Sequence, residues 1–270
     1  MASTSRRRVV QMHAGDTRTA SDEVAVEEPL TIEVNGRIVS TTMRTPGHDI
    51  ELALGWLVSE GAIHSREDIA DARECFESVA ASEEVRRTVK VTTRDGRELP
   101  ARLHSSTSAC GICGSDVIEE TVRLAPSSLG EATCSMRADR IPQLMSTLHA
   151  AQRGFAASGG LHAAALFDLE GRMICVREDV GRHNALDAVI GWALMHEGLP
   201  LRERVLVVTS RASAELAHKA VRAGAPFLVA VSAPTSLAID LAREAGLTLV
   251  GFARADSFTV YAGEHRLEAV

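Results

Sequence analysis

The second half of the chain predicts an α/β fold, and three short apolar runs carry that prediction. Val205–Val208, Phe227–Val231 and Leu247–Phe252 are rich in apolar residues and too short for buried helices, so each is expected to be a strand. Helical patterns at Ala214–Ala223 and Thr235–Glu244 separate the three runs. Because parallel strands joined through helices form right-handed crossovers, we expect a largely parallel sheet covered on both faces.

Four further elements precede these runs in the chain. Ala163–Phe167 and Met173–Val176 are predicted strands on either side of a Glu170-Gly171 turn. Asn184–Glu197 predicts a helix, and Arg140–Arg153 predicts an amphipathic helix whose apolar residues recur on one side. The sheet of the α/β part therefore gains two strands and additional helical cover.

The first half of the chain lacks this alternation, so we expect two domains and a tail. Residues 136–270 form the predicted α/β domain, and residues 22–135 a smaller α+β domain. Residues 1–21 are polar and show no apolar periodicity. A disordered N-terminal tail is the expectation for that composition.

Turn signals divide the predicted smaller domain. Asn35-Gly36 stands between two segments of strand-forming residues, the pattern of a hairpin. A helix is expected to begin near Ile50 and to end at Gly61. Glu83–Pro100 predicts a second hairpin, with its turn at Asp95-Gly96.

Charge, hydropathy and cysteine content exclude several classes of protein. The net charge of −7 over 270 residues argues against a basic surface for nucleic acid. No apolar run has the length of a membrane span, and the N-terminus lacks the apolar core of a signal peptide. The five cysteines are scattered and odd in number, unlike a secreted disulfide framework. We therefore expect a protein of the cytoplasm.

Two thiols stand in a polar, glycine-rich segment, Cys110-Gly111-Ile112-Cys113-Gly114, with serines on both sides. The segment has no apolar periodicity, so it is predicted to be a loop that presents both sulfurs. Four interpretations fit such a pair. They are half of a zinc site, a thioredoxin-like redox pair, a structural loop with incidental cysteines, and a carrier that holds sulfur as a persulfide.

The surrounding sequence makes some of these interpretations less favourable, but it leaves all four open. A zinc site needs a second ligand pair, which the sequence does not offer at a comparable spacing. A thioredoxin-like pair sits at the start of a helix, and the glycines and serines around Cys110 and Cys113 do not predict one. Sulfur transfer requires only two accessible thiolates and a loop able to move, which the glycines supply.

Two further polar motifs border the predicted strands and helices. Glu178–Ala185 brings Arg182 and His183 to the expected start of a helix, where they suit an anion, although Asn184 capping the helix, with Arg182 paired to Asp179, explains the motif equally well. Gly159–Ala164 places His162 beside a strand, where a structural role is the commoner one. A zinc deaminase would carry a glutamate two residues after such a histidine, followed later by its cysteine pair. Here the residue is an alanine and the cysteine pair comes first, so deamination is disfavoured.

The exit of the last predicted strand is a candidate binding segment. Ligands of open α/β sheets bind beyond the carboxyl ends of the strands, and Phe252–Ser257 lies at such an end. Arg254, Ser257 and backbone amides suit a phosphate, and the carboxylate of Asp256 suits the donor edge of guanine. A simple turn between two strands is the alternative.

Several long motifs, in order, resemble the formate dehydrogenase accessory sulfurtransferases known as the FdhD family. The matching segments are Glu28-Pro29-Leu30, Val34-Asn35-Gly36, Met43-Arg44-Thr45-Pro46-Gly47-His48-Asp49, Cys110-Gly111-Ile112-Cys113-Gly114, Gly159-Gly160-Leu161-His162-Ala163-Ala164, Asp179-Val180-Gly181-Arg182-His183-Asn184-Ala185 and Ala233-Pro234-Thr235-Ser236-Leu237-Ala238. Two positions depart from the family pattern. Ser210 replaces a glycine, and Ala188 replaces a lysine.

The resemblance implies a fold and an activity. The larger domain would resemble cytidine deaminase, a three-layer α/β sandwich without the zinc site. The protein would accept sulfur from a cysteine desulfurase as a persulfide on Cys110, with Cys113 as the second thiol. It would deliver that sulfur to the molybdenum bis(molybdopterin guanine dinucleotide) cofactor needed by formate dehydrogenase.

The resemblance also assigns a binding segment and an assembly. The cofactor-binding residues carried over by the family motif are Phe252, Ala253, Arg254, Ala255, Asp256 and Ser257. Nucleotides such as GDP would mimic the guanine ends of the cofactor, and the protein would be a homodimer. A non-catalytic carrier of the molybdenum cofactor, with thiols that sense redox state, is the principal alternative. A zinc-dependent hydrolase is a third.

Overall fold

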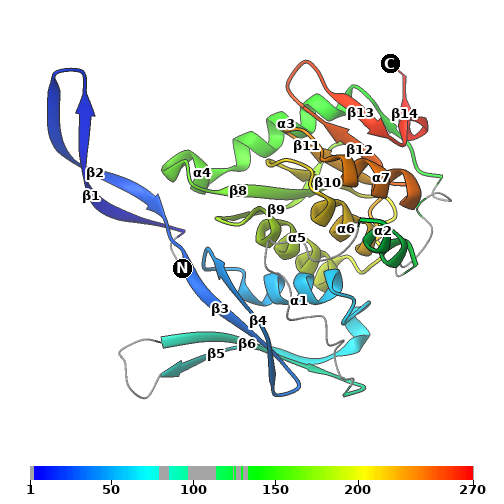
Figure 1. Cartoon of the computed structure of the whole chain (residues 1–270), viewed down its shortest axis with the longest axis horizontal. Helices are drawn as coiled ribbons and strands as arrows, with labels where there is room; N and C mark the ends of the chain where they lie inside the picture. The colour runs from blue at the N-terminus through cyan, green and yellow to red at the C-terminus, as the bar shows by residue number, and fades with distance from the viewer. Residues whose placement is uncertain are drawn as a thin grey trace.

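A six-stranded sheet lies at the centre of the larger part of the molecule (Figure 1). The computed structural model describes residues 3–78, 85–96, 114–123, 125, 129 and 133–269. The spatial order of the strands is β13-β12-β11-β10-β8-β9. Their bounds are β8 His162–Phe167, β9 Met173–Asp179, β10 Val205–Val208, β11 Phe227–Ala230, β12 Thr248–Gly251 and β13 Thr259–Ala262.

The sheet is mixed, so the expectation of a largely parallel sheet is wrong. Only β10, β11 and β12 run parallel to one another. The pairs β8–β9, β8–β10 and β12–β13 are antiparallel. The loops from β8 to β9 and from β12 to β13 hold no crossover helix, and short connections impose antiparallel pairing.

Helices cover both faces of this sheet, as predicted. On one face lie α5 (Arg182–His196), α6 (Ala214–Arg222) and α7 (Ser236–Ala245). On the other lies α3 (Arg140–Ala151), followed in the chain by the short α4 (Arg153–Ser158). The architecture is therefore a three-layer α/β sandwich.

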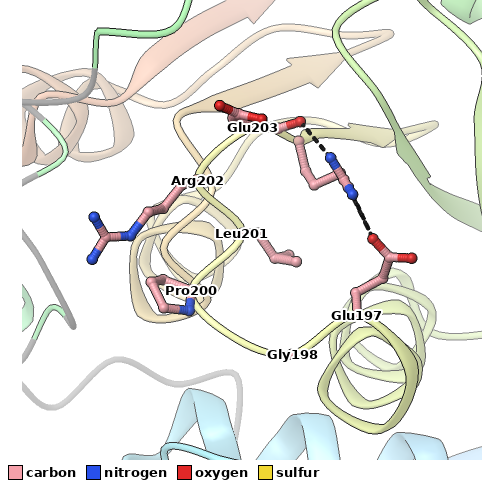
Figure 2. Close-up of a pocket in the computed structure, with 7 residues that line it drawn as sticks. Glu197, Gly198, Pro200, Leu201, Arg202 and Glu203 are labelled. Carbon is pink, nitrogen blue, oxygen red and sulfur yellow. Dashed lines mark hydrogen bonds and ion pairs between the residues drawn. The ribbon is translucent and has the colours of Figure 1, made fainter.

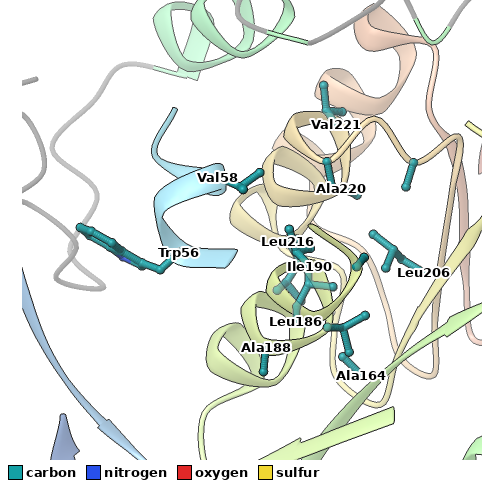
Figure 3. Close-up of a cluster of buried hydrophobic side chains, with 14 of the residues drawn as sticks. Trp56, Val58, Ala164, Leu186, Ala188, Ile190, Leu206, Leu216, Ala220 and Val221 are labelled. Carbon is teal, nitrogen blue, oxygen red and sulfur yellow. The ribbon is translucent and has the colours of Figure 1, made fainter. Parts of the chain in front are cut away.

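Residue alternation along the strands separates two hydrophobic cores. Leu206 and Val208 of β10 belong to the core beneath α5, α6 and α7, whereas Val205 and Val207 belong to the core beneath α3. Figure 3 shows the first core, where side chains of α5 and α6 meet the sheet around Leu206. Strands buried on both faces need apolar residues at every position, which explains the continuous apolar runs in the sequence.

A second sheet of four strands, in the order β4-β3-β6-β5, occupies the N-terminal half. Its bounds are β3 Glu28–Val34, β4 Arg37–Arg44, β5 Ile69–Ser78 and β6 Val85–Thr93. Asn35 and Gly36 both have positive φ, 49° and 80°, which confirms the predicted hairpin between β3 and β4.

The second predicted hairpin differs from the structure. The antiparallel partner of β6 is β5, the strand that precedes it, so β5 and β6 form the hairpin instead. Asp95-Gly96 follows the end of β6, and residues 97–100 lie outside the described part of the chain. The other neighbour of β6 is β3, in parallel pairing.

Helix α1 (Asp49–Ser59) connects the two halves of the molecule. It lies between the four-stranded sheet and α5 (Figure 1), and its apolar side chains join the core that α5 and α6 share with the larger sheet. The predicted helix near Ile50 is thereby confirmed. The division into domains at residue 135 stays a prediction.

The first residues of the chain form a hairpin, so the expected disordered tail is wrong. Strands β1 (Thr4–His13) and β2 (Asp16–Ala25) pair over ten residues each and turn at Gly15, where φ is 86°. The hairpin projects from the molecule beside α4 (Figure 1). Most of its side chains face water, so its residues carry no apolar alternation, and the pairing depends on backbone hydrogen bonds.

The remaining elements are short. They are α2 (Gly114–Arg123), β7 (Met136–Arg137), β14 (Leu267–Glu268), which pairs with β7, and single 3₁₀ turns at Arg66–Asp68 and Glu264–Arg266. No helix among the described residues is both long enough and apolar enough to cross a membrane.

Candidate functional site

The strands β10, β11 and β12 are parallel, so their carboxyl ends lie side by side at one end of the six-stranded sheet. This end of the sheet, which runs across the strands, is here called the carboxyl edge. Backbone hydrogen bonds tie together the loops that leave these strands. Thr235 N donates to Ala212 O at 3.0 Å, and Phe252 N donates to Ser232 O at 3.2 Å. The three loops therefore form one continuous rim at this edge.

The predicted binding segment Phe252–Ser257 belongs to this rim. Phe252 has φ of 50° and a side chain that is 39% exposed, while Ala253 is buried and its N–H donates to Ala230 O. The segment turns back at once, because Arg254 N donates to Ser257 O at 2.8 Å. Positive φ is unusual for a residue with a large side chain, and the surrounding hydrogen bonds hold it in place.

The turn brings the polar side chains of the segment close together. Ser257 Oγ donates to Asp256 Oδ1 at 3.0 Å. Ala255, Arg254 and Asp256 are exposed, and within the described part of the chain no hydrogen bond or ion pair involves the Arg254 guanidinium. A free cation, a hydroxyl and a carboxylate within four residues suit a ligand that is both anionic and a hydrogen-bond donor.

Gly251, the last residue of β12, allows this close approach of the loops. A Cβ at this position would lie 2.9 Å from Pro234 Cδ and 3.2 Å from Ser232 O. A side chain would therefore push apart the rim loops that follow β11 and β12.

The pairing of β8 brings two further motifs to the carboxyl edge. Because β8 is antiparallel to β10, it begins where β10 ends, and its first residue, His162, pairs with Asp179 at the end of β9. Helix α5 starts directly after this point, with Arg182 and His183. Sequence reasoning treated the motifs of His162 and Arg182 separately, and only the strand register shows that they are neighbours.

Asp179 and Asn184 have a structural role in this region. Asp179 accepts hydrogen bonds from Thr45 N at 2.9 Å, Gly181 N at 2.8 Å and Asn184 Nδ2 at 2.9 Å. Asn184 Nδ2 also donates to Met43 O at 2.7 Å. Burial raises the pKa of Asp179 to about 6, although the hydrogen bonds oppose that rise. These contacts fasten the loop between β4 and α1 to the start of α5.

Two expectations for this motif are therefore wrong. Helix α5 begins at Arg182 with Gly181 as its N-cap, so Asn184 lies inside the helix and does not cap it. Arg182 forms no pair with Asp179, whose oxygens accept from the N–H groups already named. Glu178 accepts from the N–H groups of Gly154 and Phe155, both at 2.8 Å, at the start of α4.

Arg182 and His183 are the residues of this motif that remain for a ligand. His183 Nε2 lies 2.7 Å from Glu215 Oε2 at the start of α6, a close ion-pair contact without hydrogen-bond geometry. This contact lowers the pKa of Glu215. The pKa of His162 is lowered by burial and by the nearby charges of Arg182 and His183, so the three groups lie in one electrostatic neighbourhood.

Cys110 and Cys113 lie outside the described residues, but the helix that follows them is described. Helix α2 is described over Gly114–Arg123, and the prediction that no helix starts at the pair falls on residues outside the described range. Ile118 and Val122 pack against the main core. Thr121 is buried, and its Oγ1 lies 2.7 Å from His218 Nδ1.

His218 joins α2 to α1 through its two ring nitrogens. Nε2 lies 3.0 Å from Ser59 O, and because a carbonyl only accepts, Nε2 carries the hydrogen. Nδ1 then accepts from the Thr121 hydroxyl. Burial lowers the pKa of His218 to about 4, which keeps the ring neutral near pH 7.

The described residues contain no group of three or more histidine, cysteine or carboxylate side chains suited to a metal ion. The three described cysteines, Cys75, Cys134 and Cys175, are free. Burial raises the pKa of Cys134, and that of Cys175 to about 11, so neither is a ready thiolate at neutral pH.

A cavity of about 250 Å³ lies away from the predicted site. It is formed by the loop between α5 and β10, which includes Pro200 and Leu201 (Figure 2). This loop enters β10 from the edge opposite to the carboxyl edge. Arg204 and Glu197 pair across it at 2.6 Å.

The model of the FdhD/NarQ family matches residues 25–268. The chain belongs to this family. A sulfur carrier protein FdhD from Nocardia farcinica is 47% identical over 99% of this chain and 96% of its own length. The FdhD of Mycolicibacterium paratuberculosis is 46% identical over 99% of this chain and its whole length, and that of Sulfolobus acidocaldarius is 39% identical over 97% of each chain.

Solved structures agree with the fold. A crystal structure described as a formate dehydrogenase accessory protein, from Desulfotalea psychrophila, superimposes with a TM-score of 0.78 at 22% identity. It covers 99% of this chain and all of its own. The family match includes the thiol pair and Phe252–Ser257, and it begins at the end of β2, after most of the N-terminal hairpin.

The two departures from the FdhD pattern fall at different places. Ala188 is buried in α5 within the main core (Figure 3), where a lysine would have to reach out of an apolar contact. Ser210 lies at the carboxyl edge, and its Oγ donates to Arg211 O at 3.1 Å. Only Ser210 therefore adjoins the candidate site.

Proposed function

We propose that this protein is a sulfurtransferase that carries sulfur from a cysteine desulfurase to molybdenum bis(molybdopterin guanine dinucleotide), the acceptor that formate dehydrogenase requires. The observation that carries the proposal is the family match over residues 25–268, which spans the thiol pair and the carboxyl-edge segment. The curated relatives are named sulfur carrier proteins, which supports the transfer of sulfur in general.

In the first step, the Cys110 thiolate attacks the terminal sulfur of the donor persulfide. A new S–S bond forms at Cys110, the S–S bond of the donor breaks, and the donor cysteine leaves as a thiolate. The number of electrons is conserved, because one persulfide replaces another.

In the second step, the Cys113 thiolate attacks Sγ of the Cys110 persulfide. A disulfide forms between the two cysteines, and the terminal sulfur leaves as hydrosulfide toward the metal of the acceptor. The disulfide then returns to two thiols by exchange with a cellular thiol. This order of events assigns the carried sulfur to Cys110 and its release to Cys113.

The acceptor is a substrate in this scheme, and Phe252–Ser257 is its proposed binding segment. The unpaired Arg254 guanidinium and the Ser257 hydroxyl suit a nucleotide phosphate, and the Asp256 carboxylate suits the N–H donors of guanine. GDP carries the same groups, so it should bind the segment as a mimic. We further propose, on the family resemblance, a homodimer that works in the cytoplasm.

The test uses the full chain, a cysteine desulfurase and cysteine. Intact-protein mass spectrometry should show one added sulfur on the wild type, removable by dithiothreitol, and none on Cys110→Ala. Cys113→Ala should still load sulfur but release it slowly to an acceptor. Cys134→Ala is the matched control, because that thiol is partly buried with a raised pKa and should be dispensable. Normal loading of Cys110→Ala would refute the assignment.

A carrier of the intact cofactor without sulfur chemistry is the competing function. It predicts that a Cys110→Ala, Cys113→Ala double variant still supports active formate dehydrogenase in cells that lack the wild-type protein. Sulfur transfer predicts that the double variant supports none. Dehydrogenase activity, normalised to the amount of dehydrogenase protein, separates the two.

A further inference from the structure

An unpaired arginine and two histidines lie together on the carboxyl edge, away from Phe252–Ser257. Within the described residues, the Arg182 side chain forms no hydrogen bond or ion pair. His162, at the start of β8, pairs with Asp179 at the end of β9, and Arg182 and His183 follow Asp179 at the start of α5. Arg182 and His162 are partly exposed, so a ligand can reach them, whereas Nε2 of His183 is buried against Glu215.

The local electrostatics favour an anion at this place. The charges of Arg182 and His183 disfavour a further positive charge on His162, and the carboxylate of Glu215, which also interacts with the charges of Lys219 and Arg182, makes its ion-pair contact with His183. Asp179, the other acidic group nearby, is buried and committed to backbone and amide donors. Arg182 therefore lacks an anionic partner of its own, and an anionic ligand would supply one.

The distance from this cluster to Phe252–Ser257 is set by the sheet. Between β12, which leads into that segment, and β8, which begins at His162, lie β11 and β10. Three spacings of about 4.8 Å place the two regions roughly 14 Å apart along the carboxyl edge. A ligand that carries two phosphoanhydride groups on an extended frame can span such a distance.

We propose that Arg182, His162 and His183 form a second anion subsite, which takes a phosphoanhydride group of the ligand whose guanine nucleotide binds Phe252–Ser257. The inference rests on the proposed function for the identity of that ligand. Once a ligand is bound at one of two anion sites on the carboxyl edge, its binding at the second site is intramolecular. Each site therefore raises the overall affinity that the other site provides. Glu215 acts against the subsite, because its carboxylate neutralises His183.

Inorganic pyrophosphate is the probe, titrated calorimetrically into the full chain at low ionic strength. All titrations use variants that also carry Arg254→Ala. This substitution weakens any binding of pyrophosphate at Phe252–Ser257, so the measured affinity reports on the proposed subsite. Arg182→Gln should weaken the binding of pyrophosphate about ten-fold or more, the effect of losing one charged hydrogen bond. Glu215→Gln should strengthen it about 1.5- to 5-fold, since it removes an exposed opposing charge.

Arg202→Gln is the matched control. It removes the same charge from an exposed arginine on the loop before β10, at the opposite edge of the sheet, and should leave the affinity unchanged. Affinity unaffected by Arg182→Gln, or lowered equally by Arg202→Gln, would overturn the subsite. Weaker binding by Glu215→Gln would do so as well.

The proposed function fails in a different way. If Arg254→Ala leaves the affinity for GDP unchanged, Phe252–Ser257 is not the nucleotide segment, whereas the pyrophosphate result at Arg182 still stands. Thermal denaturation of each variant shows that it is folded, which is expected because the side chains of Arg182 and Glu215 lie at the surface.

Discussion

The crossing of α1 and α5 offers a prediction whose size follows from the geometry. A Cβ added to Gly191 would lie 1.8 Å from Glu51 O and 2.8 Å from Gly55 N. A Cβ on Gly55 would likewise lie 1.8 Å from Asp187 O. Non-bonded carbon and oxygen atoms need about 3.3 Å, so in Gly191→Ala the helices must separate by roughly 1.5 Å.

The separation opens the core between the two helices. Overpacking costs typically about 1–3 kcal/mol, and the upper end applies here because backbone atoms cannot change rotamer to relieve the contact. Alanine in place of glycine inside a helix returns about 1 kcal/mol through helix propensity. We expect Gly191→Ala to lower the free energy of unfolding by about 2 kcal/mol and the Tm by roughly 4–8 °C.

Urea and thermal denaturation, followed by circular dichroism, measure both quantities. Gly154→Ala in α4 is the matched control, because the closest atom to its Cβ is Leu161 Cδ1, the end of a side chain that can move. That variant should change the free energy of unfolding by less than about 1 kcal/mol. A Gly191→Ala protein as stable as the wild type, or more so, would refute the close helix contact.

Three other predictions concern charge. Lys219→Met removes the ammonium that lies 2.8 Å from the buried carboxylate of Asp187. The free energy of unfolding, measured by urea denaturation, should fall by about 3–5 kcal/mol. A double variant that also carries Asp187→Leu should recover much of that loss, because it removes the unpaired charge. The free energy of unfolding should fall as the pH drops from about 6.5 to about 4, because the unfolded state protonates His218 first. The pKa of Asp179, raised to about 6, opposes this trend, because the folded state protonates Asp179 first. In Asp179→Asn the free energy of unfolding should therefore fall more steeply between pH 6 and pH 4. The same pH dependence as in the wild type would contradict the raised pKa of Asp179. Arg254→Ala should weaken GDP binding about ten-fold or more in a fluorescence or calorimetric titration, with the Tm nearly unchanged.

The elements that depend on local patterns were predictable from the sequence. The apolar runs that became β10, β11 and β12 are short and strongly biased, and Asn35-Gly36 adopts the positive φ values that its residue types favour. The four predicted helices of the α/β half begin and end within two residues of their predicted bounds, whereas the short α4 was not predicted. These features depend on residues near one another in the chain, so one sequence is enough to reveal them.

Other features depend on partners far away in the chain. The hairpin of β1 and β2 escaped prediction because its side chains face water, and only the pairing of its backbones defines it. The structural role of Asp179 was hidden because its partner Thr45 lies 134 positions earlier. The mixed direction of the large sheet likewise depends on which strands come to lie beside β8.

The candidate site divides in the same way. The sequence by itself determined the thiol pair, the polar exit at Phe252–Ser257 and the membership of the family, because each is a contiguous string of residue types. Only the tertiary structure decided that His162 and Arg182 are neighbours on one sheet edge, and that Asp179 and Asn184 serve the fold. Strand register and helix packing set those relations, and both depend on contacts that no local pattern encodes.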